Sequence, residues 1–134
     1  GFATTEIIAA SLLDMSYHTI KTDLKGDISK FETDEMKKIG LINEIIPRYR
    51  STYFQHIFSG GYSSGYYSYT WAGVLDADAF QAFKEKGLFD RKTADSFRKN
   101  VLSKGKTEDP MKLYVRFRGA EPSTEPLLRK RGLK

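Results

Sequence analysis

Apolar residues recur along most of the chain at intervals of three and four, the spacing that places them on one face of an α-helix. Six segments show this pattern, and between them stand glycines, prolines and short polar stretches. An additional apolar run over residues 41–46 ends at Pro47. The predicted helices span residues 4–20, 29–39, 62–86, 91–103, 110–119 and 124–132, each to within a residue or two.

The ends of these segments carry the residues that start and stop helices. Asp90 stands before the fourth segment, and Asp109 with Pro110 fits the cap and first-turn positions of the fifth. Gly87 and Gly119 follow the third and fifth segments, where a glycine ends a helix at little steric cost. Strand-like alternation is never sustained, and no repeat of 20–50 residues is found. The sequence predicts an all-α fold, with residues 1–134 forming a single helical domain or fragment.

Composition narrows the class of protein. With 134 residues, 40% hydrophobic and 29% charged, the chain is predicted to be soluble and globular, with no membrane association. Cysteine is absent, which excludes thiol catalysis and thiolate zinc sites. His18 and His56 are far apart, and no HExxH motif is present, so no metal site is expected in this chain.

Charge is distributed unevenly along the chain. Residues 1–83 hold 7 basic and 10 acidic side chains, a net −3, whereas residues 84–134 hold 15 and 7, a net +8. A basic surplus of this size is compatible with two interpretations. It can be the solvated surface of several helices, or it can attract nucleic acid or acidic peptides.

The segment SGGYSSGYYSY, residues 59–69, contains only Gly, Ser and Tyr. If a helix begins near Tyr62, then Tyr62, Tyr66 and Tyr69 lie on one narrow face, opposite a packed face that carries Tyr67, Trp71 and Val74. Tyrosines at the rim of a core would explain the row. The glycines that precede and interrupt it, beginning with Gly60 and Gly61, favour instead a surface that something approaches closely.

The run RYRSTYFQHIFSGGYSSGYYSYTWAGVLDADAF, residues 48–80, closely resembles the C-terminal part of the thermolysin-like zinc oligopeptidases, the thimet oligopeptidase family. AASLLDMSYHT before it, and FRKNVLSKGKTEDPM and FRGAEPSTEPLLRKRGLK after it, extend the resemblance over nearly the whole chain. The spacing in HIFSGGY and the run LDADAF are most similar to the peptidyl-dipeptidase (dipeptidyl carboxypeptidase) branch. Members of this family are almost wholly helical.

The resemblance implies a function and a set of site residues. Tyr66 or Tyr69 would donate a hydrogen bond to the developing oxyanion, while His56 and Tyr62 hold the peptide backbone and Gly60 with Gly61 forms a mobile loop over it. The family's zinc ligands lie upstream of the region seen here. The chain would therefore be the C-terminal fragment of a cytoplasmic zinc peptidase that acts on short peptides, inactive alone and without bound metal.

Two further expectations follow. Where the family usually has Leu-Trp-Ala/Ser-Glu after the last tyrosine, this chain has Gly73 in place of the acid, predicted on the tyrosine face. Helix 4–20 would have packed on the missing zinc-bearing helices, so Ile7, Ile8 and Leu12 are expected to be exposed. Such a surface would either cause self-association or leave the chain only marginally stable as a monomer. The alternative is a non-enzymatic basic helical module that binds peptide or nucleic acid.

Overall fold

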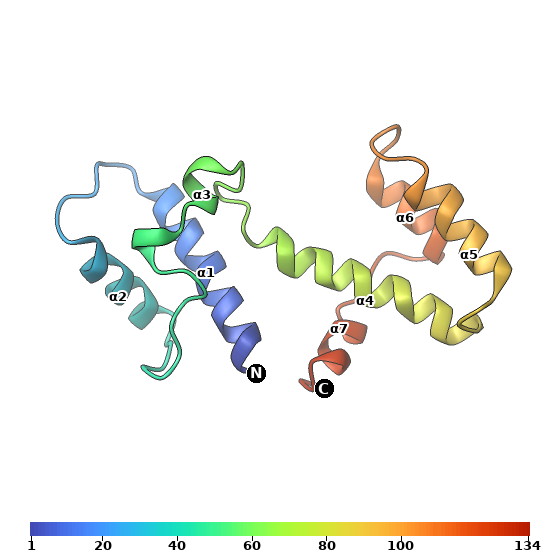
Figure 1. Cartoon of the computed structure of the whole chain (residues 1–134), viewed down its shortest axis with the longest axis horizontal. Coiled ribbons are helices and arrows are strands. Elements are labelled where there is room, and N and C mark those ends of the chain that lie inside the picture. The colour runs from blue at the N-terminus through green and yellow to red at the C-terminus, as the bar shows by residue number, and fades with distance from the viewer. The chain divides into compact units, whose positions relative to one another are not determined.

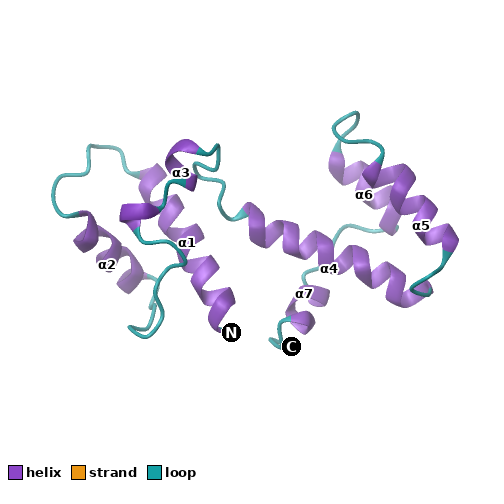
Figure 2. Ribbon diagram, viewed as in Figure 1, coloured by secondary structure: helices purple, strands orange, loops and turns teal.

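The computed structural model describes residues 1–134, and every regular element in it is a helix (Figure 1, Figure 2). The predicted all-α fold is confirmed. Two short helical turns of other types, η1 and η2, accompany seven α-helices. The elements are α1 (Phe2–Thr19), α2 (Ile28–Lys38), η1 (Ser51–Tyr53), α3 (His56–Ser59), α4 (Ser68–Lys86), α5 (Arg91–Phe97), η2 (Arg98–Leu102), α6 (Pro110–Arg118) and α7 (Glu125–Lys130).

The chain divides into two compact units, residues 1–70 and residues 71–134. The first unit holds α1, α2, η1 and α3, and the second holds α5, η2, α6, α7 and most of α4. None of the helices combines the length and apolar character needed to cross a membrane.

The core of the first unit forms where α1 meets α2 and the segment around α3. On α1, Ala9, Ala10 and Leu13 are all buried in this core. On α2, the buried Glu32 accepts hydrogen bonds from the Ser51 backbone N–H at 2.6 Å and from the Ser51 hydroxyl, and it pairs with Arg50. These contacts tie α2 to η1. The buried core residues are Ala9, Ala10, Leu13, Met36, Phe54, Ile57 and Tyr66.

The helix predicted from Tyr62 begins six residues later, at Ser68, so that prediction is wrong at its N-terminal end. Residues 63–67 form turns instead. Gly61 and Ser64 have positive φ angles of 76° and 54°, which are incompatible with a right-handed helix. A buried carboxylate on α1, that of Asp14, accepts the backbone N–H groups of Ser64 and Tyr66.

In the second unit, Val74 and Ala77 on α4 pack with Leu127 on α7. The predicted caps are confirmed, because Asp90 accepts the Thr93 backbone N–H at 2.8 Å and Asp109 accepts that of Lys112 at 2.9 Å. The predicted helix 91–103 forms as α5 followed by the π-helical turn η2. This turn closes with a hydrogen bond from the Ser103 N–H to the Arg98 carbonyl at 2.9 Å.

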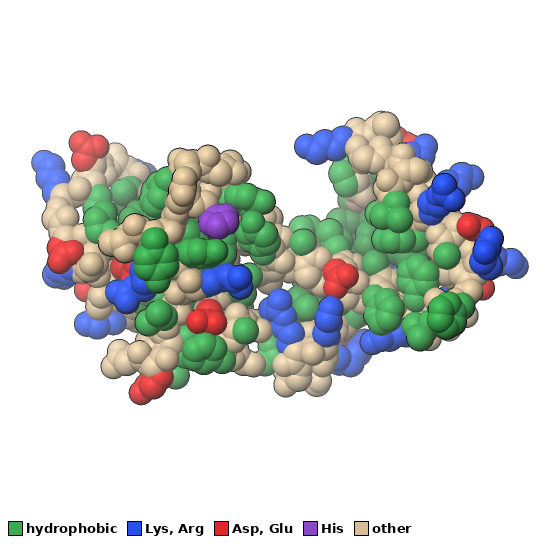
Figure 3. Space-filling view, viewed as in Figure 1, with side chains coloured by type: hydrophobic (Ala, Val, Ile, Leu, Met, Phe, Trp, Pro, Cys, Tyr) green, Lys and Arg blue, Asp and Glu red, His purple; other side chains and the backbone are tan.

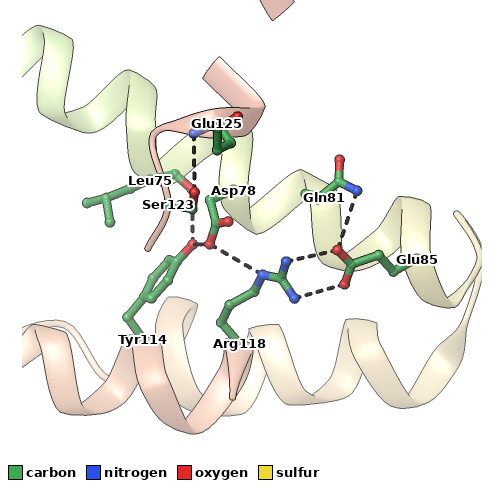
Figure 4. Close-up of polar contacts among 8 residues, drawn as sticks. All are labelled: Leu75, Asp78, Gln81, Glu85, Tyr114, Arg118, Ser123 and Glu125. Carbon is green, nitrogen blue, oxygen red and sulfur yellow. Dashed lines mark hydrogen bonds and ion pairs between the residues drawn. The ribbon is translucent and has the colours of Figure 1, made fainter. Parts of the chain in front are cut away.

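A buried carboxylate joins α4 to α6 (Figure 4). The Tyr114 hydroxyl donates to Asp78 at 2.6 Å, and Arg118 contacts the same oxygen at 3.3 Å. The two terminal nitrogens of Arg118 donate to the two oxygens of Glu85 at 2.9 and 3.0 Å. Burial and the contact with Asp78 raise the pKa of Tyr114, so its hydroxyl stays a donor. Every group in this network has a partner, and it fastens the two helices together.

Within α4, Gly73 follows Tyr69 by four residues and so shares that tyrosine's side of the helix as predicted, whereas Tyr62 and Tyr66 lie outside the helix. A Cβ added at Gly73 would lie 3.7 Å from Nη2 of Arg131 and 3.8 Å from the Leu127 methyl groups, both within the second unit. The helical-wheel placement of Gly73 relative to Tyr62 and Tyr66 was wrong, because it continued a helix from Tyr62 through a segment that is not helical. The glycine therefore marks where α4 approaches α7.

Hydrophobic side chains remain at the surface of both units (Figure 3). On α1, Ile8 and Leu12 are 42% and 41% exposed, as predicted for that face. Ile7 is only partly exposed, because it packs against the core of the first unit. In the second unit, Phe80 and Phe89 are exposed as well.

Candidate functional site

The structure gathers four of the predicted site residues within the first unit. His56 begins α3, Tyr62 lies in the loop that follows, Tyr66 lies in the turns of residues 63–67, and Tyr69 is the second residue of α4. The rings of Tyr62 and Tyr69 stack with their centroids 5.2 Å apart, and Tyr69 meets Tyr66 edge to face at 5.1 Å. The ring of His56 lies 6.2 Å from that of Tyr62 and 6.3 Å from that of Tyr66. We call these four residues the tyrosine cluster.

Asp14 fixes the backbone beneath this cluster. Its side chain is fully buried on α1, and its two oxygens accept the Ser64 N–H at 3.0 Å and the Tyr66 N–H at 2.9 Å. Nδ1 of His18 lies 2.8 Å from one of these oxygens. A buried carboxylate is tolerated only when its oxygens are hydrogen-bonded, and here backbone donors satisfy both. The turn that carries Tyr66 is thereby locked to α1.

The loop between His56 and Tyr62 depends on its two glycines. A Cβ at Gly60 would come within 3.0 Å of the His56 carbonyl oxygen, too close for an ordinary contact. Gly61 has a φ of 76°, a conformation that other residues rarely adopt. The conformation of this loop therefore requires glycine at both positions, independently of any contact with a ligand.

A pocket of about 190 Å³ opens beside the cluster. Its polar edge is formed by a guanidinium, an imidazole and three phenols, and its wall includes an aliphatic side chain from α1. Such a lining can hold the polar backbone of a peptide and an adjacent side chain. The lining residues are Ile7, Arg48, Tyr49, His56, Tyr66 and Tyr69.

The phenols of this pocket are poor acids. A hydrogen bond with Tyr62, followed by desolvation, raises the pKa of Tyr69 to about 12. Burial raises the pKa of Tyr66, and the nearby positive charge of Arg48 opposes this rise. Both hydroxyls therefore keep their protons at neutral pH, as a hydrogen-bond donor must.

The phenols do not share one exposed helix face, contrary to the prediction. Tyr66 is only 3% exposed, with its ring packed edge to face on Phe54 at 4.9 Å. Tyr67 and Trp71, predicted on the packed face, are 56% and 43% exposed. The turns before Ser68 move Tyr66 and Tyr67 away from the helical positions assumed for them, whereas Trp71 lies within α4.

Sequence reasoning missed three contributors to this site, namely Asp14, Arg48 and Tyr49. Asp14 stands as a lone carboxylate within an apolar stripe, LLDM, which is a signal for a buried acid with a fixed partner. Tyr49 stacks on Phe54 at 5.2 Å and lies 5.1 Å from the ring of His56. Their proximity to the tyrosine cluster depends on the tertiary fold.

Metal ligands do not converge in this chain. No group of three His, Cys, Asp or Glu residues is placed to hold a metal ion, and the ring of His18 is engaged with Asp14. The residues present therefore do not fit a zinc site of three protein ligands.

The comparisons with known proteins agree with the sequence resemblance. The model of peptidase family M3 matches residues 1–133. The dipeptidyl carboxypeptidase of Escherichia coli strain K12 is 40% identical over 135 residues, which cover 99% of this chain. Oligopeptidase A of the same strain is 56% identical over 81 residues, 60% of this chain. The organellar oligopeptidase A of Arabidopsis thaliana is 42% identical over 142 residues, 99% of this chain.

The matched regions make up 20%, 12% and 17% of these three relatives. The chain thus spans about a fifth of the length of the E. coli dipeptidyl carboxypeptidase, and the family match covers nearly all of its own residues. Together with the all-helical structure, these findings show that the chain belongs to peptidase family M3.

Proposed function

We propose that this chain is the C-terminal, substrate-binding part of a zinc-dependent peptidase that removes dipeptides from the C-termini of short peptides. The observation that carries the proposal is the convergence of His56, Tyr66 and Tyr69 on one pocket, with Tyr62 stacked on Tyr69, in a chain that belongs to a peptidase family. The two units would serve together as one portion of the complete enzyme.

The phenols supply the chemistry assigned to this part. Hydrolysis of a peptide bond places negative charge on the carbonyl oxygen in the transition state, and a preplaced O–H donor stabilises that charge. Tyr69 is 40% exposed whereas Tyr66 is buried, so Tyr69 is the phenol that a substrate reaches more readily. Tyr66 then holds the ring of Tyr69 in place through their edge-to-face contact. His56 and Tyr62 bind the peptide backbone.

The remaining machinery lies, in this proposal, outside the 134 residues. An HExxH helix and a later Glu elsewhere in the complete enzyme would hold the zinc, which would supply activation of the attacking water. Gly60 and Gly61 form the loop that folds over the bound peptide. The chain alone is inactive, because it presents hydrogen-bond donors without a nucleophile.

The basic surplus of residues 84–134 has no ligand role in this proposal. Many of its cations pair with carboxylates of the same unit, which favours a solvated helical surface over a nucleic-acid site. The pairs are Lys104 and Arg116 with Glu108, Arg118 with Asp78 and Glu85, Arg129 and Lys134 with Glu125, and Lys130 with Asp76.

We further infer a cytoplasmic location for the parent enzyme. The relatives' names give both possibilities, since Arabidopsis thaliana has a probable cytosolic oligopeptidase A as well as the organellar one. Fractionation of cells that express the full-length protein would decide between these compartments.

The test compares the full-length gene product with the 134-residue chain on a set of octapeptides with free C-termini, using mass spectrometry to identify products. The full-length protein should release C-terminal dipeptides in succession, and the isolated chain should release none. Internal cleavage without dipeptide release would replace the proposed action by that of an endopeptidase. No cleavage of any peptide by a folded, zinc-loaded full-length protein would refute the proposal.

A further inference from the structure

Two arginines that are two residues apart in sequence have different surroundings. Arg50 is paired with the buried carboxylate of Glu32, which ties it to α2. Arg48 takes part in none of the ion pairs of the chain, so no carboxylate lies within 4.0 Å of its guanidinium. Its charge is therefore available to a ligand.

The position of Arg48 is defined by its backbone. Its N–H donates to the Glu6 carbonyl of α1 at 3.2 Å, which anchors the residue beside the first helix. Its side chain lines the same pocket as His56, Tyr66 and Tyr69. The charge also acts on the phenol of Tyr66, because it favours the ionised form of that hydroxyl. A positive charge thus stands at the pocket edge among neutral O–H donors.

We propose that Arg48 binds the free C-terminal carboxylate of the peptide substrate and thereby sets the position at which the peptide is cut. This inference rests on the proposed function and deepens it. A guanidinium matches a carboxylate with two parallel N–H donors, which fixes the orientation of the group as well as attracting it. Neighbouring phenols then donate to the rest of the peptide.

The same chemistry would also accept the side chain of an acidic residue in the substrate. We assign Arg48 to the terminal carboxylate, because that group lies at a fixed distance from the scissile bond in every substrate. Its recognition would therefore release dipeptides whatever the peptide sequence. Peptides that separate the two sources of carboxylate therefore form part of the test.

The experiment uses the full-length peptidase and matched pairs of peptides that end in a free acid or in an amide, each made with and without an internal Glu. The measured quantity is the ratio of kcat/KM for the acid to that for the amide. Wild-type enzyme should prefer the acid. In Arg48→Gln this preference should fall by about 10- to 100-fold, the range expected when one charge-assisted hydrogen-bonded pair is lost.

Two further variants make the result interpretable. Arg48→Lys keeps the charge but not the planar fork, so it should restore part of the preference. Arg50→Gln breaks the pair with Glu32 and should lower the melting temperature while leaving the acid-to-amide ratio as in wild type.

A ratio that is unchanged in Arg48→Gln would overturn the inference, as would a preference that follows the internal Glu instead of the terminus. Either result leaves the proposed peptidase function intact, because the peptides are still cut. A full-length enzyme that cuts neither the acid nor the amide would instead refute the proposed function itself. The two failures are thus distinguishable.

Discussion

Replacing Asp14 by Ala tests how the tyrosine cluster is held. The change removes the acceptor of two backbone N–H groups, and the Tyr66 N–H then stays buried without a partner. Hydrogen bonds to a charged acceptor contribute about 1.5–3 kcal/mol each. Two such bonds would contribute about 3–6 kcal/mol. Because Asp14→Ala also removes the cost of burying a carboxylate, the free energy of unfolding should fall by an amount in the lower part of that range, about 3–4 kcal/mol.

Urea unfolding of the 134-residue chain, followed by far-UV circular dichroism, measures this loss. With a slope of about 1.5–2 kcal/mol per molar urea, the midpoint for the first unit should fall by about 2 M. Asp14→Asn retains one acceptor oxygen, so its urea midpoint should lie between those of Asp14→Ala and wild type. Asp34→Ala is the control, because Asp34 pairs only with Lys30 on the exposed face of α2.

Amide hydrogen exchange supplies a local readout for the same variants. The Tyr66 N–H of wild type should be protected, since it is buried and bonded to Asp14 at 2.9 Å. An Asp14→Ala protein with a wild-type urea midpoint and a still-protected Tyr66 amide would contradict the role given to this carboxylate.

Four further predictions concern the second unit and the chain as a whole. Gly73→Ala should stabilise the second unit by about 0.5–1 kcal/mol in thermal unfolding, because alanine favours the helix and its Cβ fits beside Leu127; a lower melting temperature would show that the fit is wrong. A hydrogen bond from Arg118 holds the pKa of Glu85 below its usual value. The pair therefore stabilises the fold fully at pH values above the unfolded-state pKa of about 4.3, and this stabilisation is lost as the pH falls through the lower pKa of the folded state. Glu85→Gln should therefore flatten the dependence of melting temperature on pH over that acidic window, and an unaltered dependence would argue against the pair. Dialysed chain should contain far less than one zinc per molecule by elemental analysis, since no three ligands converge, and one tightly held equivalent would contradict this. Sedimentation across a wide concentration range should reveal self-association through exposed apolar surface such as that of α1, whereas a stable monomer at all concentrations would refute it.

Local signals in the sequence predicted the helix ends well. Asp90 and Asp109 cap their helices as expected, and Gly119 ends α6 with a φ of 84°. Each of these features depends on residues within one turn of the helix end, so neighbouring sequence is sufficient to specify it. The two caps required no knowledge of tertiary contacts.

The start of α4 could not be predicted in this way. The turn around Ser64 is stabilised by Asp14, 50 residues earlier in the chain, and helical spacing over residues 62–69 gives no sign of that bond. Tyr62, Tyr66 and Tyr69 do lie close together, but through turns and not on the continuous helix face that the sequence predicted. Arg48 and Tyr49 were missed because their role depends on the path that brings η1 and α3 beside α1.

The central claim is that a phenol of the tyrosine cluster donates to the oxyanion during peptide hydrolysis. Substituting Tyr69 or Tyr66 by Phe in the full-length enzyme removes the oxygen and keeps the ring. Tyr67→Phe is the matched control, because Tyr67 is 56% exposed and does not line the pocket.

The decisive measurement is kcat for a good peptide substrate, compared among wild type and these three variants. The account predicts that Tyr69→Phe or Tyr66→Phe lowers kcat by about 10²–10³-fold with a smaller change in KM, while Tyr67→Phe behaves as wild type. Wild-type kcat in both Tyr66→Phe and Tyr69→Phe would contradict the proposed role and would show that these phenols only contribute to packing.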